Sequence, residues 1–268
     1  MKNSHLFALP IALLALTSAL VAGPRPGVFN LLDDGGVPDG KTNNTAAIAR
    51  TIAACAEVGG GTILFPAGKY LTGAIMPEGN QTLDLDAGSE LLHSGDPADS
   101  PIVASGWECT NVYTHASLIY ADGKHHIAIT GRGTLNGQGW NGWWRSNSRG
   151  RESPAGEDAA ANQTAWRKVY ARIAAGEKLT APAFVQAAKF IRPSLIGLYH
   201  CKNVLVADIT LFKSPLWMLH PVYCDLVVRN SRAAARTGSF RFLTGAQTAG
   251  VVLTTSDLTR AKTDVELG

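Results

Sequence analysis

The acidic residues are the first candidates for chemistry, because paired carboxylates act as general acid and general base in many hydrolases. Asp33 and Asp34 are adjacent in a glycine-rich stretch near the start of the chain, where carboxylates are usually solvated turn residues. Asp84 and Asp86 alternate with leucines, so we expect them to share the solvent-facing side of one strand. Neither pair has an evident reason for one carboxyl group to stay protonated. No catalytic residue is therefore assigned from the acidic pairs.

Other catalytic and metal-binding motifs are missing from the sequence. It contains no G-x-S-x-G, no H-E-x-x-H and no Walker loop. His125 and His126 begin a predicted strand, where successive side chains point to opposite faces, so we do not expect them to share a metal. The four cysteines include no Cys-x-x-Cys pair, which argues against a structural zinc site. We therefore expect neither a metal nor a cofactor.

The segment from Asn141 to Arg192 is a candidate binding region. It has nine Lys or Arg residues against four Asp or Glu residues. Cations beside aromatic rings suit an acidic polysaccharide. The alternative is that the tryptophans pack the segment against the rest of the fold and the cations are only solvated. The tryptophans in or beside this segment are Trp140, Trp143, Trp144 and Trp166.

One helix followed by many short strands must position these residues. Helix N-cap residues at 42–44 precede Ile48, Ile52 and Cys55 at helical spacing, and glycines at 59–61 provide a C-terminal stop. Beyond this helix, short β-rich runs with a period of two are separated by Gly, Pro, Asp and Asn. A short helix is expected again only near 166–173, inside the segment described above.

A repeat of 22 to 23 residues relates residues 201–208 to residues 224–230, with a looser copy before them. Periods near this length, built from strands and turns, indicate a solenoid and hence a parallel β-helix. The predicted N-terminal helix would cover its first coil, whose strand edges would otherwise be exposed. Asp208 and Asp225 fall at turn positions of this repeat.

Cys201 and Cys224 occupy like places in the repeat, so they are expected to stack on neighbouring coils. They are either a disulfide or two small buried residues, and we favour the second interpretation.

Composition and the N-terminus indicate an exported, single-domain protein. A chain of 268 residues, 46% hydrophobic and 17% charged, can bury a sizeable core, and a monomer is expected. Residues 1–23 have the layout of a signal peptide, with an apolar run too short to span a membrane and small residues between Ala19 and Gly23. We expect a secreted or periplasmic protein without membrane association after cleavage. A net charge of +3 is only weak evidence for binding to a polyanion, so nucleic acid is not an expected partner.

Three ordered segments carry a family resemblance that extends from about Phe29 to Asn230. They are residues 33–73, "GRGTLNGQGWNGWW" at 131–144, and "RPSLIGLYHCKNVLVADITLFKSPLWMLHPVYC" at 192–224. Together they resemble the polygalacturonases of glycoside hydrolase family 28. The resemblance implies an all-β fold, a right-handed single-stranded parallel β-helix of the pectin-lyase type with an N-terminal capping helix. It also implies inverting hydrolysis of α-1,4 galacturonide bonds, with pectin or polygalacturonate as the partner.

The resemblance also bears on individual residues. By resemblance, the strand with Trp217 and His220 borders the groove, so both are candidates for substrate contact. The family's catalytic aspartates follow this strand in Asn-Thr-Asp, Asp-Asp, Gly-His-Gly and Arg-Ile-Lys motifs. Only Asp-Asp occurs here, as Asp33-Asp34 at the other end of the chain. No catalytic residue is assigned by resemblance either.

The expected organisation is therefore a signal peptide at 1–23, a β-helix at 29–230 with an inserted loop at 141–192, and a divergent tail at 231–268. We expect the repeat to vanish from Ser231 onward, through either a frame change or a divergent cap. The catalytic coil would then be missing, and the chain would not hydrolyse polygalacturonate at an enzyme-like rate. The alternative to a polygalacturonase-like hydrolase is a non-catalytic polysaccharide-binding β-helix or an inactive truncated product.

Overall fold

The computed structural model describes residues 27–107, 110–144, 159–234, 238–244, 251–254 and 261–267, with side chains described up to Arg232. The expected signal peptide at 1–23 and Cys109 lie outside these residues. In the described part of the chain, no helix is long and apolar enough to cross a membrane.

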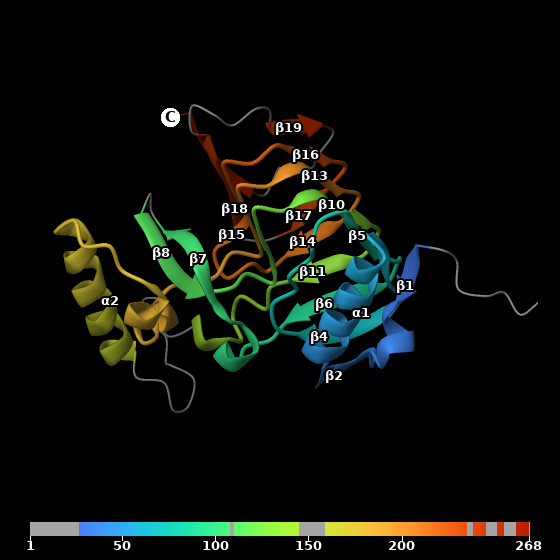
Figure 1. The fold of residues 1–268 in the computed structure, drawn as a ribbon, viewed down its shortest axis with the longest axis horizontal. Coiled ribbons are helices and arrows are strands. Elements are labelled where there is room, and N and C mark those ends of the chain that lie inside the picture. The colour runs from blue at the N-terminus through green and yellow to red at the C-terminus, as the bar shows by residue number, and fades with distance from the viewer. Residues whose placement is uncertain are drawn as a thin grey trace, which may run out of the picture.

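Three parallel sheets wind around a common core and form successive faces of a solenoid (Figure 1). Sheet A consists of β1 (Val28–Asn30), β3 (Gly61–Phe65), β5 (Gln81–Leu85), β10 (His125–Gly131), β13 (Lys202–Ala207), β16 (Leu226–Arg229) and β19 (Val251–Thr254). Sheet B consists of β2 (Asp39–Asn43), β4 (Gly68–Thr72), β6 (Ser89–His93), β11 (Thr134–Asn136), β14 (Thr210–Phe212) and β17 (Arg232–Ala234). Sheet C consists of β9 (Ile119–Asp122), β12 (Ile196–Tyr199), β15 (Trp217–Val222), β18 (Gly238–Thr244) and β20 (Ala261–Leu267). The expected all-β, right-handed parallel β-helix is confirmed.

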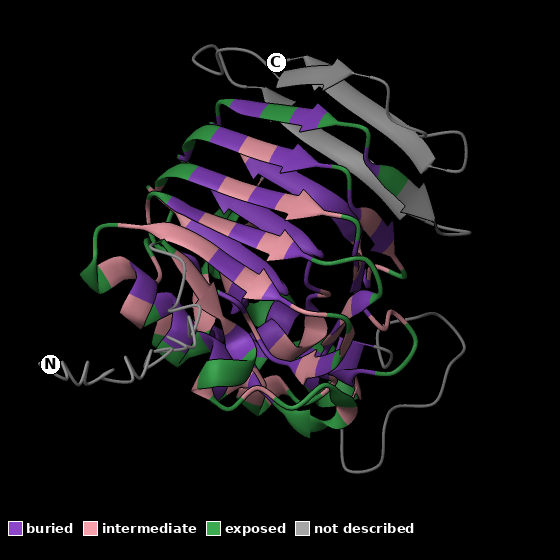
Figure 2. Ribbon diagram, turned by 90° about the vertical axis from the view of Figure 1, so that its right-hand side faces the viewer, coloured by how far each residue is buried: buried purple, intermediate pink, exposed green. Residues whose placement is uncertain are grey.

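Alternation along each strand builds the core. In sheet A, one inward row runs through Leu83, Ile129, Val206 and Val228, which pair in register and are buried. Outward neighbours are less buried, and Asp84 there accepts a hydrogen bond of 3.1 Å from the Thr130 hydroxyl. Figure 2 shows this alternation along the stacked strands. The outward position expected for Asp84 is confirmed, because the core has no room for an unpaired carboxylate.

The turns between sheets A and B use the left-handed conformation at equivalent positions. Gly131 ends β10, and Asp208 and Asn230 directly follow β13 and β16, with φ of 106°, 63° and 48°. A Cβ atom at Gly131 would lie 2.1 Å from the carbonyl oxygen of Leu85, so this turn requires glycine. Asp208 therefore lies at a turn position, as the repeat predicted.

Helix α1 (Thr45–Glu57) covers the N-terminal end of the solenoid beside β1 and β3 (Figure 1). Its buried face includes Ile48, Ile52 and Cys55, as their spacing predicted. The side-chain amide of Gln81 on the coil below donates to the carbonyl oxygen of Ile52, 2.8 Å away. This contact fixes the capping helix to the coil beneath it.

Two excursions leave the solenoid between sheets B and C. The first contains the 3₁₀-helix η2 (Pro97–Asp99) and an antiparallel hairpin of β7 (Ile102–Trp107) and β8 (Thr110–His115). The second contains helix α2 (Ala159–Ala174) and the 3₁₀-helices η4 (Ala181–Phe184) and η5 (Ala187–Phe190). Helix α2 begins earlier than the short helix expected at 166–173, because Asn162, Trp166 and Val169 continue its buried face. The hairpin, α2, η4 and η5 share one apolar cluster formed by Val112, Trp166, Val169, Phe184, Ala187 and Ile191.

The expectation that the repeat vanishes from Ser231 onward is wrong for the strands. Strand β17 pairs with β14, β18 with β15, β19 with β16, and β20 with β18, all parallel. Parallel pairing uses backbone N–H and C=O groups, so it continues where the side-chain pattern of the repeat is lost. The β-helix therefore extends to Leu267.

Candidate functional site: the outer face of sheet C

The outer face of sheet C is built by the same alternation as the core. On the first three strands Ile119, Leu198 and Leu219 belong to the core. Their neighbours along the strands form two outward rows. The first row is Tyr120, Gly197 and His220, and the second is Asp122, Tyr199 and Val222. Sheet C thus presents aromatic and titratable side chains on one face.

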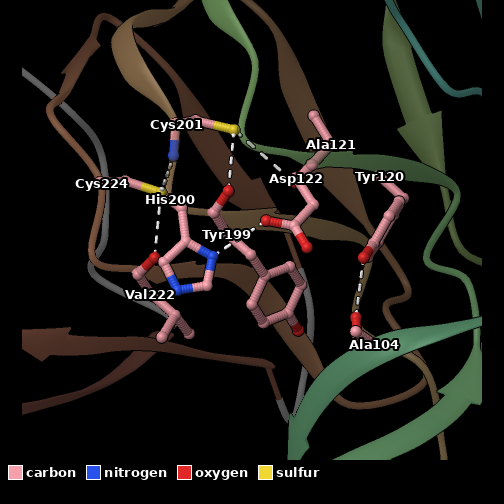
Figure 3. A network of polar contacts seen from close by, with 9 residues as sticks. All are labelled: Ala104, Tyr120, Ala121, Asp122, Tyr199, His200, Cys201, Val222 and Cys224. Carbon is pink, nitrogen blue, oxygen red and sulfur yellow. Dashed lines mark hydrogen bonds and ion pairs between the residues drawn. The ribbon is translucent and has the colours of Figure 1, made fainter.

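The β7–β8 hairpin covers this face. The Tyr120 hydroxyl donates to the carbonyl oxygen of Ala104, 2.8 Å away (Figure 3). The Tyr199 hydroxyl lies 2.9 Å from the Ser105 hydroxyl. Burial raises the pKa of Tyr199 to about 12, so its hydroxyl stays protonated near neutral pH. The outer face is therefore closed over β9 and β12.

Trp217 and His220, the predicted substrate contacts, are brought together beneath this cover. His220 is 1% exposed and Trp217 is 8% exposed. The Tyr199 hydroxyl lies 3.0 Å from His220 Nδ1, and the rings of Trp217 and His220 are 4.5 Å apart between centroids. The Trp107 ring of the hairpin lies 6.1 Å from that of Trp217. The role of Trp217 and His220 remains a prediction. Because both side chains are buried, a role in anchoring the hairpin is favoured rather than direct contact with a sugar.

The exposed edge of sheet C lies at the turn that follows each strand. Gly123, His200 and Tyr223 take equivalent places there, with φ of 65°, 53° and 54°. Asp122 Oδ1 lies 2.9 Å from His200 Nδ1 (Figure 3). The rings of His200 and Tyr223 are stacked, with centroids 5.6 Å apart and planes at 15°. Sequence reasoning missed this group, although a ring-bearing residue stands directly before each repeated cysteine.

Cys201 and Cys224 stack on neighbouring coils, as the repeat predicted. Both are free thiols and buried, which supports the favoured interpretation over a disulfide. The backbone N–H of Cys201 donates to Cys224 Sγ at 3.4 Å, and Cys224 Sγ donates to the carbonyl oxygen of Val222 at 3.3 Å (Figure 3). The two thiols therefore help to hold the turn that carries His200 and Tyr223.

The tryptophans of the 141–192 segment mostly pack. Trp143, Trp144 and Trp166 are buried, whereas Trp140 is 44% exposed. His93 stacks on Trp144, with ring centroids 5.2 Å apart, and anchors this segment to sheet B. The packing interpretation therefore holds for three of the four rings, and the ring of Trp140 is exposed.

Most of the described cations of this segment are exposed. Arg167, Lys168 and Arg172 lie on the exposed part of α2, and Arg172 forms two hydrogen bonds to the carboxylate of Glu177. Binding of an acidic chain by this segment stays a prediction.

The carboxylates considered from the sequence lie away from sheet C. Asp33 and Asp34 belong to the 3₁₀-helix η1 (Leu31–Asp34) beside α1. Within sheet C, β9 carries Asp122, the strands β12, β15 and β18 contain no acidic residue, and β20 carries Asp264 and Glu266.

No group of three or more potential metal ligands occurs in the described residues. The expectation that no metal is needed stays a prediction.

Comparison with known proteins identifies the relatives of this chain. Residues 28–137 match the family described as rhamnogalacturonase A/epimerase, pectate lyase-like. A probable polygalacturonase of Vitis vinifera is 31% identical over 204 residues, which cover 72% of this chain and 34% of the relative. The chain is related to the polygalacturonases of glycoside hydrolase family 28. It spans about a third of the length of the curated relatives it matches.

Solved polygalacturonase structures agree with this relationship. An exopolygalacturonase from Thermotoga maritima is 25% identical with a TM-score of 0.68, over 85% of this chain and 54% of that one. The family 28 exopolygalacturonase of Yersinia enterocolitica is 27% identical with a TM-score of 0.59, over 81% of this chain and 41% of that one. The resemblance carried by the three sequence segments is confirmed.

Proposed function

We propose that this protein is a polygalacturonase-type glycoside hydrolase that cleaves galacturonide bonds of pectin or polygalacturonate from a chain end. The observation that carries the proposal is the hairpin over the outer face of sheet C. A polymer laid along this face cannot extend over β9 and β12, because the Tyr120 and Tyr199 hydroxyls already bond to the hairpin. Only a chain end then fits against the remaining strands. The exopolygalacturonases among the similar structures support this mode of attack.

The chemistry needs one carboxyl group to protonate the leaving oxygen and another to activate water. The expectation of an inactive chain rested partly on the loss of strands after Ser231, and those strands are present.

The test is release of reducing ends and of free galacturonate from polygalacturonate by the purified protein. We expect galacturonate as the first product. The Asp33→Asn, Asp34→Asn double variant should keep full activity, because both residues lie in η1. No release by the unmodified protein would overturn the hydrolase proposal. Early release of mixed oligosaccharides would overturn attack from the chain end.

We also propose that the protein is exported as a monomer after removal of residues 1–23. The support is the short apolar run followed by small residues between Ala19 and Gly23. N-terminal sequencing of protein recovered outside the cytoplasm checks this, and a sequence that begins at Met1 would contradict it. Size-exclusion chromatography with light scattering checks the monomer.

A further inference from the structure

The turn after the strands of sheet C carries an exposed stack of two rings. The Tyr223 side chain is 54% exposed. Its ring lies parallel to that of His200, which is also exposed. Asp122 holds the imidazole through Nδ1. A carboxylate accepts hydrogen bonds, so in the neutral imidazole the proton resides on Nδ1 and Nε2 is an acceptor.

The backbone at this turn does not favour these residues. His200 and Tyr223 are in the left-handed region, with φ of 53° and 54°. That region is unfavourable by about 1–2 kcal/mol for most side chains and free of strain for glycine. The preceding coil has Gly123 at the equivalent place. Glycine fits this conformation without strain, so the backbone does not require a ring at either position.

We propose that His200 and Tyr223, oriented by Asp122, form a stacking platform for one uronic-acid ring of an oligogalacturonide. The flat faces of the rings suit the apolar face of a sugar, and His200 Nε2 accepts a bond from a sugar hydroxyl. Lys202, exposed two residues after His200 and without a carboxylate partner among the described residues, supplies a cation for the uronate carboxylate. This inference rests on the proposed function for its substrate class.

The experiment compares glycine variants at equivalent backbone positions. His200→Gly and Tyr223→Gly remove the rings and relieve the backbone, so we expect thermal midpoints within about 3 °C of the unmodified protein. Affinity for trigalacturonate, measured by isothermal titration at low temperature, should fall about 5- to 10-fold in each variant, the size of one lost aromatic contact. Tyr223→Phe keeps the ring and should restore most of the affinity.

Asn230→Gly is the matched control, because Asn230 has the same left-handed conformation at an exposed turn between sheets A and B. Its affinity for trigalacturonate should not change. Unchanged affinity in both ring variants, while the unmodified protein binds, would overturn this inference and leave the proposed function standing. Equal affinity of the unmodified protein for cellotriose would overturn the uronate assignment. Absence of both binding and cleavage by the unmodified protein would instead refute the proposed function, and this inference with it.

Discussion

The buried imidazole of His93 should make the stability of the fold depend on pH. The side chain is 0% exposed at the end of β6, where it meets the rings of Trp143 and Trp144. Its Nε2 atom lies 3.4 Å from the Ser100 hydroxyl. Burial, together with the electrostatic effect of neighbouring His115, lowers the pKa of His93 to about 3. The folded protein therefore holds this imidazole neutral.

The sign and size follow from proton linkage. The ordinary pKa of histidine in an unfolded chain is about 6.5. Between pH 6.5 and about 3, the unfolded chain binds a proton that the folded protein does not, so the free energy of unfolding falls as the pH is lowered. Each pH unit in this window is worth about 1.4 kcal/mol, which gives a loss of about 2–3 kcal/mol at pH 4.5.

Urea denaturation at pH 7 and pH 4.5 measures this effect. The comparison is between the unmodified protein and His93→Gln, whose side chain does not titrate. Whatever its stability at pH 7, the variant should lose about 2–3 kcal/mol less on acidification. His125→Gln, at an exposed position on β10, is the control and should follow the unmodified protein. An equal loss of free energy in His93→Gln and in the unmodified protein would refute the reasoning.

Three further changes test the packing. Tyr199→Phe removes the hydroxyl that contacts Ser105 beneath the hairpin, so the free energy of unfolding should fall by about 1–3 kcal/mol. Hydrogen exchange in β7 should also become faster. Unchanged exchange would contradict the conclusion that the hairpin closes this face. Ile129→Ala opens a cavity in the inward row, so the free energy of unfolding measured in urea should fall by about 2–5 kcal/mol. Val227→Ala, on the outward side of β16, should lower the free energy of unfolding by less than about 1 kcal/mol. Gly131→Ala forces a Cβ atom toward a carbonyl oxygen, and calorimetry should find a lower thermal midpoint; an unchanged midpoint would show that the turn can relax.

The periodic part of the fold could be predicted from the sequence. Alternating apolar residues determine which side of each strand faces the core, as the row through Leu83 and Ile129 illustrates. The repeat places Cys201 over Cys224, because coils of nearly equal length bring equivalent residues together. The capping helix follows from its own caps and apolar spacing. These features depend on contacts within one coil or between neighbours, so a short stretch of sequence contains them.

The candidate site depended on the tertiary structure. Asp122 and His200 are 78 positions apart, and only the stacking of coils brings the carboxylate to the imidazole. The hairpin buries His220 through contacts between an excursion and a sheet, and no local pattern records where an excursion folds back. The strands after Ser231 escaped prediction because backbone pairing needs no repeated side chains. Sequence periodicity determined the solenoid, and long-range contacts decided which of its faces is closed and which edge is open to a ligand.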